Sequence, residues 1–258
     1  MKKSSFHLKT AIVIGGTSGM GKATAKLLLE NGVKVIVISK SQTSIDAALT
    51  ELSAFGEVSG VRLNLTSDID VSGYISILEQ DGQSINYLVN ASGIFAPKPF
   101  LDSTREDYDA FLNINRGFYF ITQAVAKKMK ANGGGSIVNI GSYWAEHAVK
   151  GMPTSAYSMA KAALQAFTRH AAMELADDKI RVNAIAPGIV ETGVLDELMG
   201  SAEGVKEAYK GFNSIHPLGR NGQPADVANA IVFLLSDEAA WITGTVLDID
   251  GGLAAGRS

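Results

Sequence analysis

The chain has 258 residues, of which 46% are hydrophobic and 19% are charged, and its net charge is −3. This balance predicts a globular protein with a full hydrophobic core and excludes a disordered chain. The mild acidity gives no positive field for nucleic acid or an anionic membrane, and the lack of cysteine excludes disulfides, zinc–thiolate sites and thiol nucleophiles.

The N-terminal stretch carries two lysines, but its apolar run covers only residues 11–14 before glycines follow. A signal peptide has a longer apolar segment, and a membrane span needs about 20 residues. We therefore expect a soluble, cytoplasmic protein.

Short apolar runs alternate with longer amphipathic segments along the whole chain. The strand-like runs are 11–16, 34–39, 60–65, 85–92, 135–142, 180–187 and 245–252. The helical patterns are 22–30, 124–130, 158–176 and 224–235. Nearly continuous apolar strands are buried on both faces, as in a parallel sheet. The alternation predicts an α/β fold, a doubly wound parallel sheet of about seven strands with helices on both faces, and no linker divides residues 1–258.

A glycine-rich turn follows the first strand and opens the first helix. Gly15, Gly19 and Gly21 have the spacing G-x-x-x-G-x-G, and Thr17 and Ser18 add hydroxyl groups. Glycines let the backbone approach a pyrophosphate, and the amides at a helix N-terminus favour its negative charge. This turn is a candidate dinucleotide site, although an ordinary βα turn is also rich in glycine.

The stretch TSAYSMAK places Tyr157 four residues before Lys161, on one face of a predicted helix. A free tyrosine has a pKa of about 10, and a nearby ammonium favours the phenolate and so lowers that pKa. Ser142 ends the strand-like run before this helix. Without other motifs, Tyr157 and Lys161 could simply lie on a solvated helix face, and Ser142 could be an ordinary turn serine.

The glycine turn and Tyr157-x-x-x-Lys161 together resemble the short-chain dehydrogenase/reductase family, in its short single-domain branch. The resemblance covers nearly the whole chain, with the motifs in the right order, and implies a Rossmann-type fold. It implies an oxidoreductase that interconverts a carbonyl and a secondary alcohol by hydride transfer. Tyr157 would be the general acid/base, Ser142 would hold the substrate oxygen, and Lys161 would bind the nicotinamide ribose.

The fourth catalytic residue of the family is an asparagine on the preceding helix. Counting forward from Tyr108 places it at Asn115, whereas counting back from the run FYFITQAV places it at Ile114. We assign it to Asn115 and expect Asn113 to be a structural cap or a solvent-exposed residue.

The residue after the second strand distinguishes the two nicotinamide cofactors, since an acid there binds the free ribose hydroxyl. Here Ser39 takes that place and Lys40 and Ser41 follow, a set that suits a 2′-phosphate. We expect NADP(H). If Lys40 is only a solvated loop cation, NAD(H) remains the alternative.

The resemblance assigns further cofactor contacts to the glycine turn, to later strand ends and to a Pro-Gly turn. Asn64 stands where the family usually has aspartate, and Ala91 replaces a second asparagine. The full set is Gly15, Thr17, Ser18, Gly19, Met20, Gly21, Ser39, Lys40, Ser41, Asn64, Leu65, Asn90, Ala91, Ser92, Gly93, Tyr157, Lys161, Pro187, Gly188, Val190 and Thr192.

Residues 190–216 are expected to form a substrate lid with helical patches broken by Gly200, Gly204 and Gly211. Large apolar residues border the expected substrate pocket: Phe95, Phe100, Trp144, Met152, Met199 and Phe212. His147 is read as a surface residue, with a place in the pocket as the alternative. No His and carboxylate cluster has metal-ligand spacing.

The partners expected are a small carbonyl or alcohol substrate and other copies of the chain. The resemblance implies a homotetramer in which helices around 101–130 and 157–176 pair. A rival from another class is a catalytically silent NADP(H)-binding sensor, but the presence of Ser142, Tyr157 and Lys161 together argues against it.

Overall fold

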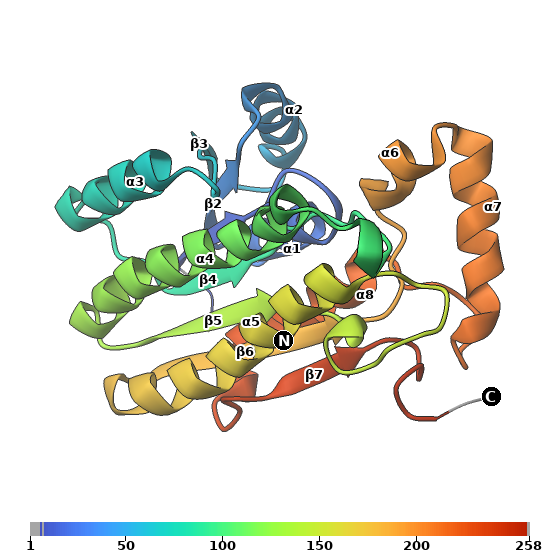
Figure 1. Cartoon of the computed structure of the whole chain (residues 1–258). Helices are drawn as coiled ribbons and strands as arrows, with labels where there is room; N and C mark the ends of the chain where they lie inside the picture. Colours follow the sequence, from blue (N-terminus) through green and yellow to red (C-terminus); the bar gives the residue numbers. More distant parts are fainter. Residues whose placement is uncertain (1–5, 7, 257–258) are drawn as a thin grey trace.

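The computed structural model describes residue 6 and residues 8–256, and for residues 197 and 198 it describes the backbone alone. Residues 1–5 and 7 of the stretch considered as a signal peptide, and residues 257–258, lie outside the described residues. The strands are β1 Thr10–Ile14, β2 Lys34–Ser39, β3 Val58–Arg62, β4 Tyr87–Asn90, β5 Gly135–Ile140, β6 Ile180–Pro187 and β7 Val246–Ile249. The helices are α1 Gly19–Glu30, α2 Gln42–Leu52, α3 Asp68–Gln80, α4 Arg105–Ala131, α5 Ser155–Leu175, α6 Asp196–Met199, α7 Ala202–Phe212 and α8 Pro224–Leu235 (Figure 1).

The described strands form one seven-stranded sheet in the order β3-β2-β1-β4-β5-β6-β7, and all neighbouring pairs are parallel. The predicted parallel sheet is therefore confirmed. The strand order reverses between β1 and β4, and such a switch point opens a crevice beyond the carboxyl ends of the strands. This crevice lies between the glycine turn after β1 and the turn after β4.

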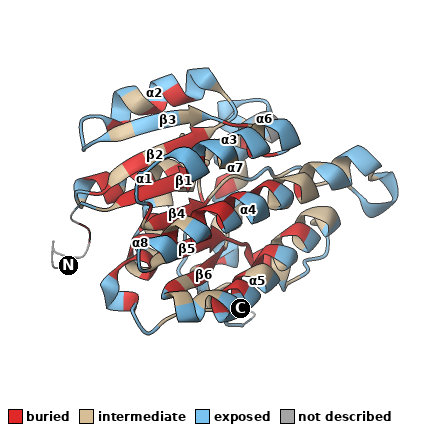
Figure 2. Cartoon of the chain, turned by 90° about the vertical axis from the view of Figure 1, so that its left-hand side faces the viewer, coloured by how far each residue is buried: buried red, intermediate tan, exposed pale blue. Residues whose placement is uncertain are grey.

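The core has two layers, one on each face of the sheet. Ala11 and Val13 of β1 pack with α1 and α8, whereas Ile12 and Ile14 pack with α3, α4 and α5. Successive side chains of a strand point to opposite faces, so a strand covered on both sides reads as a continuous apolar run. Figure 2 shows the resulting buried centre of the sheet. Within the described residues, no helix has the length and apolarity needed to cross a membrane.

Several observed boundaries differ from the predicted ones. The run expected at 60–65 is strand only as Val58–Arg62, and the chain then leaves the sheet. The helix expected at 124–130 is the second half of α4, which begins at Arg105. The helix around 101–130 that the resemblance implied is close to these bounds. A capping box starts it: Thr104 accepts from the Asp107 amide, and Asp107 accepts from the Thr104 amide.

The segment after β6 carries α6 and α7, which stand at one end of the sheet (Figure 1). The expectation that glycines break its helices is correct only at Gly200, which caps α6 with a φ of 67°. It is wrong at Gly204 and Gly211, because α7 runs through both. Ser201 caps α7 by accepting from the Gly204 amide, and Tyr209 buries its apolar face, so the helix forms despite its glycines.

Candidate functional site

A cavity of about 1120 Å³ lies at the carboxyl ends of the strands. Residues at or just after the ends of the first six strands line it: Ile14, Ser39, Leu63, Ala91, Ile140 and Pro187. The segment after β6 supplies a further wall through Val190, Thr192 and Tyr209. Ligand sites of open α/β sheets occupy this edge, so the cavity is the candidate active site.

The glycine turn is packed so tightly that side chains would not fit. A Cβ built on Gly15, whose φ is +81°, would lie 2.6 Å from the Ser92 amide nitrogen. A Cβ on Gly21 would collide with the carbonyl oxygen of Gly15. Ser18 is the N-cap of α1 but its side chain makes no capping hydrogen bond, and it lines the cavity with Gly19. The amides at the start of α1 thus border the cavity, as a pyrophosphate site requires.

A basic side pocket of about 420 Å³ adjoins the cavity at the ends of β2 and β3. Lys40 and Arg62 supply two positive charges, Asp70 supplies one negative charge, and Ser41 and Asn64 complete the lining. Lys40 and Asn64 also line the main cavity. Among the described residues, neither Lys40 nor Arg62 forms an ion pair.

Sequence reasoning missed Arg62. The parallel register of β2 and β3 pairs Ser39 with Arg62, which brings the arginine beside the residue that distinguishes the cofactors. In the sequence Arg62 is a charged residue inside the strand-like run 60–65, and the residue with which it pairs is not readable from one sequence.

Most of the residues assigned to the cofactor line the main cavity, with two exceptions. Ser41 lies only in the side pocket, where its hydroxyl oxygen also accepts from the Ser44 amide and caps α2. Asn90 is fully buried below the cavity, and its amide donates to Thr122 at 3.0 Å and to Asn139 at 2.7 Å. Its side chain therefore joins β4 to α4 and β5 and does not face a ligand.

Ser142, Tyr157 and Lys161 all line the cavity close to the end of β5. The Lys161 ammonium donates to the Ile140 carbonyl oxygen at 2.7 Å, and its nitrogen lies 5.8 Å from the centre of the Tyr157 ring. Ser142 begins the turn after β5, and its oxygen accepts from the Trp144 amide at 3.2 Å. The strand end and one face of α5 thus bring the three functional groups together.

The pKa values at this centre are set mainly by burial. Burial raises the pKa of Tyr157, and a hydrogen bond with Ser142 acts in the opposite direction. Burial also lowers the pKa of Lys161 to about 8. The expectation that Lys161 lowers the tyrosine pKa is therefore not met, because desolvation of the phenolate is the larger effect. Tyr157 is held in its protonated form.

Two aromatic rings fix the position of Tyr157. Phe95 packs edge-on against it with ring centres 5.3 Å apart, and Phe111 does so at 5.9 Å. Phe95 lines the cavity as well, so one side of the phenol faces an apolar wall. This packing limits the motion of the ring and leaves its hydroxyl group beside Ser142.

Asn115 lies next to this centre but does not line the cavity. Its amide donates to the Ala160 carbonyl oxygen at 2.6 Å and so joins α4 to α5 one residue before Lys161. Ile114 and Asn113 line the cavity instead. Asn113, which was expected to be a structural cap or a solvent-exposed residue, is half-buried within α4 and lines the cavity.

The apolar residues expected at the substrate end divide into two groups. Phe95, Trp144, Met152 and Phe212 line the cavity, whereas Phe100 and Met199 are exposed and do not. His147 stacks on Tyr143 with ring centres 4.3 Å apart and lies outside the cavity lining. The observed wall is apolar and aromatic where it adjoins Tyr157.

The sequence similarities agree with this site. Residues 15–254 match the family model described as enoyl-(acyl carrier protein) reductase. The 3alpha-hydroxysteroid dehydrogenase of Mediterraneibacter gnavus is 36% identical over 248 residues, which cover 94% of this chain and 96% of that protein. The 3-oxoacyl-(acyl-carrier-protein) reductase FabG of Thermotoga maritima is 36% identical over 247 residues, which cover 95% of this chain and 97% of that protein.

A solved structure extends the similarity to the fold. The L-sorbose reductase of Gluconobacter frateurii, complexed with NADPH and L-sorbose, has a TM-score of 0.88 and is 25% identical; the match covers 97% of this chain and 98% of that one. The cavity lies at the switch point, where doubly wound sheets bind dinucleotides. The chain belongs to the short-chain dehydrogenase/reductase family and is an NAD(P)-dependent oxidoreductase.

Proposed function

We propose that the protein interconverts a carbonyl and a secondary alcohol with NADP(H) as the redox partner. The observation that carries the proposal is the meeting of Ser142, Tyr157 and Lys161 in the cavity that also contains the glycine turn. Acid–base groups and a dinucleotide cradle in one cavity are what hydride transfer to a carbonyl needs.

The tight glycine packing supports a dinucleotide in this cavity. Only a bare backbone at Gly15 and Gly21 fits against the Ser92 amide and the Gly15 carbonyl oxygen, and the first amides of α1 are positioned for phosphate oxygens. When bound, the nicotinamide supplies the hydride. Lys161 would hold its ribose, since this lysine lines the cavity beside Tyr157.

The proton is the contribution of the chain itself. Because burial holds Tyr157 protonated, its hydroxyl group is ready to donate to a carbonyl oxygen in the direction of reduction. The hydroxyl of Ser142 would hold that oxygen beside the phenol. Asn115 would support this centre indirectly, by fixing α5 at Ala160 against α4.

The choice of NADP(H) rests on the side pocket. Lys40 and Arg62 give it a net positive charge against the single carboxylate of Asp70, and no acid stands at Ser39 to bind a free ribose hydroxyl. Charge-assisted bonds from lysine and arginine favour a phosphate. NAD(H) would leave both cations unmatched.

The direct test measures the oxidation of NADPH and of NADH with a panel of carbonyl compounds. The apolar wall of Phe95, Trp144 and Phe212 favours a carbonyl with apolar flanks, so the panel should contain a steroid ketone and a 3-oxoacyl thioester, with a polar ketose for comparison. We expect NADPH oxidation with at least one of these. Tight binding of NADPH with no turnover on the panel would instead favour the silent sensor.

We further propose that the chain assembles with copies of itself. Tyr119 and Phe120 on α4 and Met173 on α5 are exposed apolar side chains, and Trp241 after α8 is fully exposed. Exposed patches of this kind on large helices mark protein interfaces. Light scattering should give the mass of a tetramer, and Phe120→Asp should lower it; a monomeric mass for the unaltered protein would refute this assembly.

A further inference from the structure

We propose that Tyr209 is a positioning residue that holds the segment after β6 closed over the glycine turn, so that α7 and the nicotinamide half of the cofactor are bound together. The inference rests on the proposed function and extends it to a residue outside the catalytic centre. It is carried by the contacts of Tyr209, Thr192 and Gly19.

The hydroxyl group of Tyr209 binds both backbone groups of Thr192. It donates to the Thr192 carbonyl oxygen at 2.6 Å and accepts from the Thr192 amide at 3.1 Å. The side chain is only 8% exposed, and it comes from α7, seventeen positions further along the chain. One buried hydroxyl thus sets the backbone orientation of Thr192, which a phenylalanine ring of the same shape would not do.

Thr192 in turn lies against the glycine turn. A Cβ built on Gly19 would lie 3.2 Å from the Thr192 methyl carbon and 3.3 Å from its Cβ. Both residues line the cavity, and Gly19 is the first residue of α1. Thr192 therefore lies against the place where the phosphates and the nicotinamide would meet. The bonds from Tyr209 fix the distance between Thr192 and the glycine turn.

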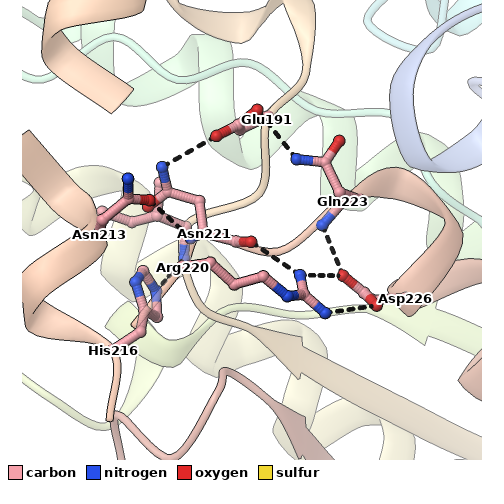
Figure 3. Close-up of polar contacts among 8 residues, drawn as sticks. Glu191, Asn213, His216, Arg220, Asn221, Gln223 and Asp226 are labelled. Carbon is pink, nitrogen blue, oxygen red and sulfur yellow. Dashed lines mark hydrogen bonds and ion pairs between the residues drawn. The ribbon is translucent and has the colours of Figure 1, made fainter. Parts of the chain in front are cut away.

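A second group of polar residues, Glu191, Asn221 and Gln223, forms hydrogen bonds that hold the same segment in place (Figure 3). The amide of Asn221, which is 1% exposed, donates to Glu191 at 3.1 Å and to the Tyr209 carbonyl oxygen at 2.7 Å. Gln223 donates to the other carboxylate oxygen of Glu191 at 2.9 Å. The loop before α8 thus joins the residue before Thr192 to the helix that carries Tyr209.

A third contact closes the far end of this segment. His216 is buried, and its Nε2 accepts from the Ile189 amide at 3.2 Å while its Nδ1 donates to the Phe212 carbonyl oxygen at 3.0 Å. The two ends of the lid are therefore tied at His216. Between these ends, Tyr209 bonds to the backbone of Thr192, the residue that lies against the glycine turn.

The test compares two ligands that share one end of the cavity. NADPH spans the whole site, whereas adenosine 2′,5′-bisphosphate has the adenosine, the 2′-phosphate for the side pocket with Lys40 and Arg62 and one phosphate for the glycine turn, but no nicotinamide half. For Tyr209→Phe we expect NADPH affinity to fall about tenfold, the effect of losing one to two hydrogen bonds. The bisphosphate affinity should stay within about twofold of that of the unaltered protein. Lys210→Ala, an exposed change on the same helix, is the matched control and should alter neither affinity.

Equal losses for both ligands would show a general loss of structure, and no loss for either would show that Tyr209 does not act on the cofactor; both overturn the inference. Hydrogen exchange of the unaltered protein gives an independent reading. NADPH should slow exchange in α7 and the bisphosphate should not. If the unaltered protein binds neither NADPH nor NADH, the proposed function fails; if it binds NADPH and the Phe variant binds it equally well, the inference alone fails.

Discussion

Lys161 donates a hydrogen bond of 2.7 Å to the carbonyl oxygen of Ile140, and this bond ties helix α5 to the last residue of β5. The strand end on which Ser142 follows and the helix that carries Tyr157 are therefore held in one fixed relation. The ammonium that makes this bond is buried, and burial lowers its pKa to about 8.

The lowered pKa of Lys161 predicts the alkaline limit of activity. Below about pH 8 the ammonium is charged and can hold the ribose; as pH rises through about 8 it loses its proton, while Tyr157, whose pKa is raised, stays protonated. We expect kcat/KM for ketone reduction to decline above about pH 8.

The loss of the Lys161 proton should also weaken NADPH binding in a variant that cannot catalyse the reaction. In Tyr157→Phe, NADPH affinity should fall over the same pH range, and Lys161→Met should bind weakly with no inflection. An inflection near the ordinary tyrosine pKa of about 10, lost in Tyr157→Phe, would assign the limit to Tyr157 instead. The same pKa predicts how stability depends on pH. Above about pH 8 the unfolded chain keeps the Lys161 proton and the folded chain loses it, so this group makes folding more favourable as pH rises from there.

The side pocket predicts the cofactor preference. Lys40→Ala and Arg62→Ala should each weaken NADPH binding by about ten- to a hundredfold, since each removes a bond from a charged group to phosphate. NADH affinity should be almost unchanged. Lys127→Ala, an exposed charge on α4, controls for the change in net charge. Equal effects on NADPH and NADH would remove the basis for assigning the pocket to a 2′-phosphate.

The glycine turn predicts a large effect from a single methyl group. In Gly21→Ala the new Cβ collides with the Gly15 carbonyl oxygen, so the start of α1 must shift and dinucleotide binding should be lost. Gly73→Ala in α3 is the matched control, because a Cβ there meets nothing within 4 Å. The control should be more stable by about 0.5–1 kcal/mol and bind NADPH normally, since alanine is the better helix former. Isothermal titration on both variants decides the matter, and normal binding by Gly21→Ala would contradict the close packing.

Replacing Arg181 should lower the stability of the fold without lowering the catalytic rate. Its guanidinium donates to the carbonyl oxygens of Leu234, Leu235, Ser236 and Ile242 and so satisfies the C-terminal end of α8. Arg181→Met would leave these acceptors without their donor, at a cost of about 2–4 kcal/mol. Thermal unfolding should show a lower Tm, with kcat per folded molecule retained. An unchanged Tm would mean that water replaces the guanidinium at no cost.

The fold could be predicted from sequence wherever the signal was local. Strands covered on both faces show as continuous apolar runs, and the boundaries of α8 match the prediction because Pro224 marks its start and Leu235 ends its apolar pattern. The apolar pattern indicated only the second half of α4, because charged and amide side chains interrupt the pattern in the first half, and the extent of about 101–130 came from the resemblance. The helix α7 was hidden by Gly204 and Gly211, whose low helix propensity is outweighed by the burial of Tyr209.

The candidate site divides along the same line. Ser142, Tyr157 and Lys161 were found because one strand end and one helical spacing bring them together. Arg62 was missed because its place depends on the register between β2 and β3. Tyr209 was missed because its contact with Thr192 joins two positions of the lid that are seventeen residues apart. Asn90 was placed in the cofactor site by resemblance, although its side chain is used inside the core.

The central claim is that Tyr157 delivers the proton in a carbonyl reduction, and Tyr157→Phe tests it most directly. Phenylalanine keeps the edge-on packing with Phe95 and Phe111 but has no hydroxyl group. On a substrate found with the unaltered protein, we predict that kcat/KM falls about a thousandfold or more while NADPH affinity stays within about threefold. Turnover near that of the unaltered protein, with NADPH still bound, would contradict the account.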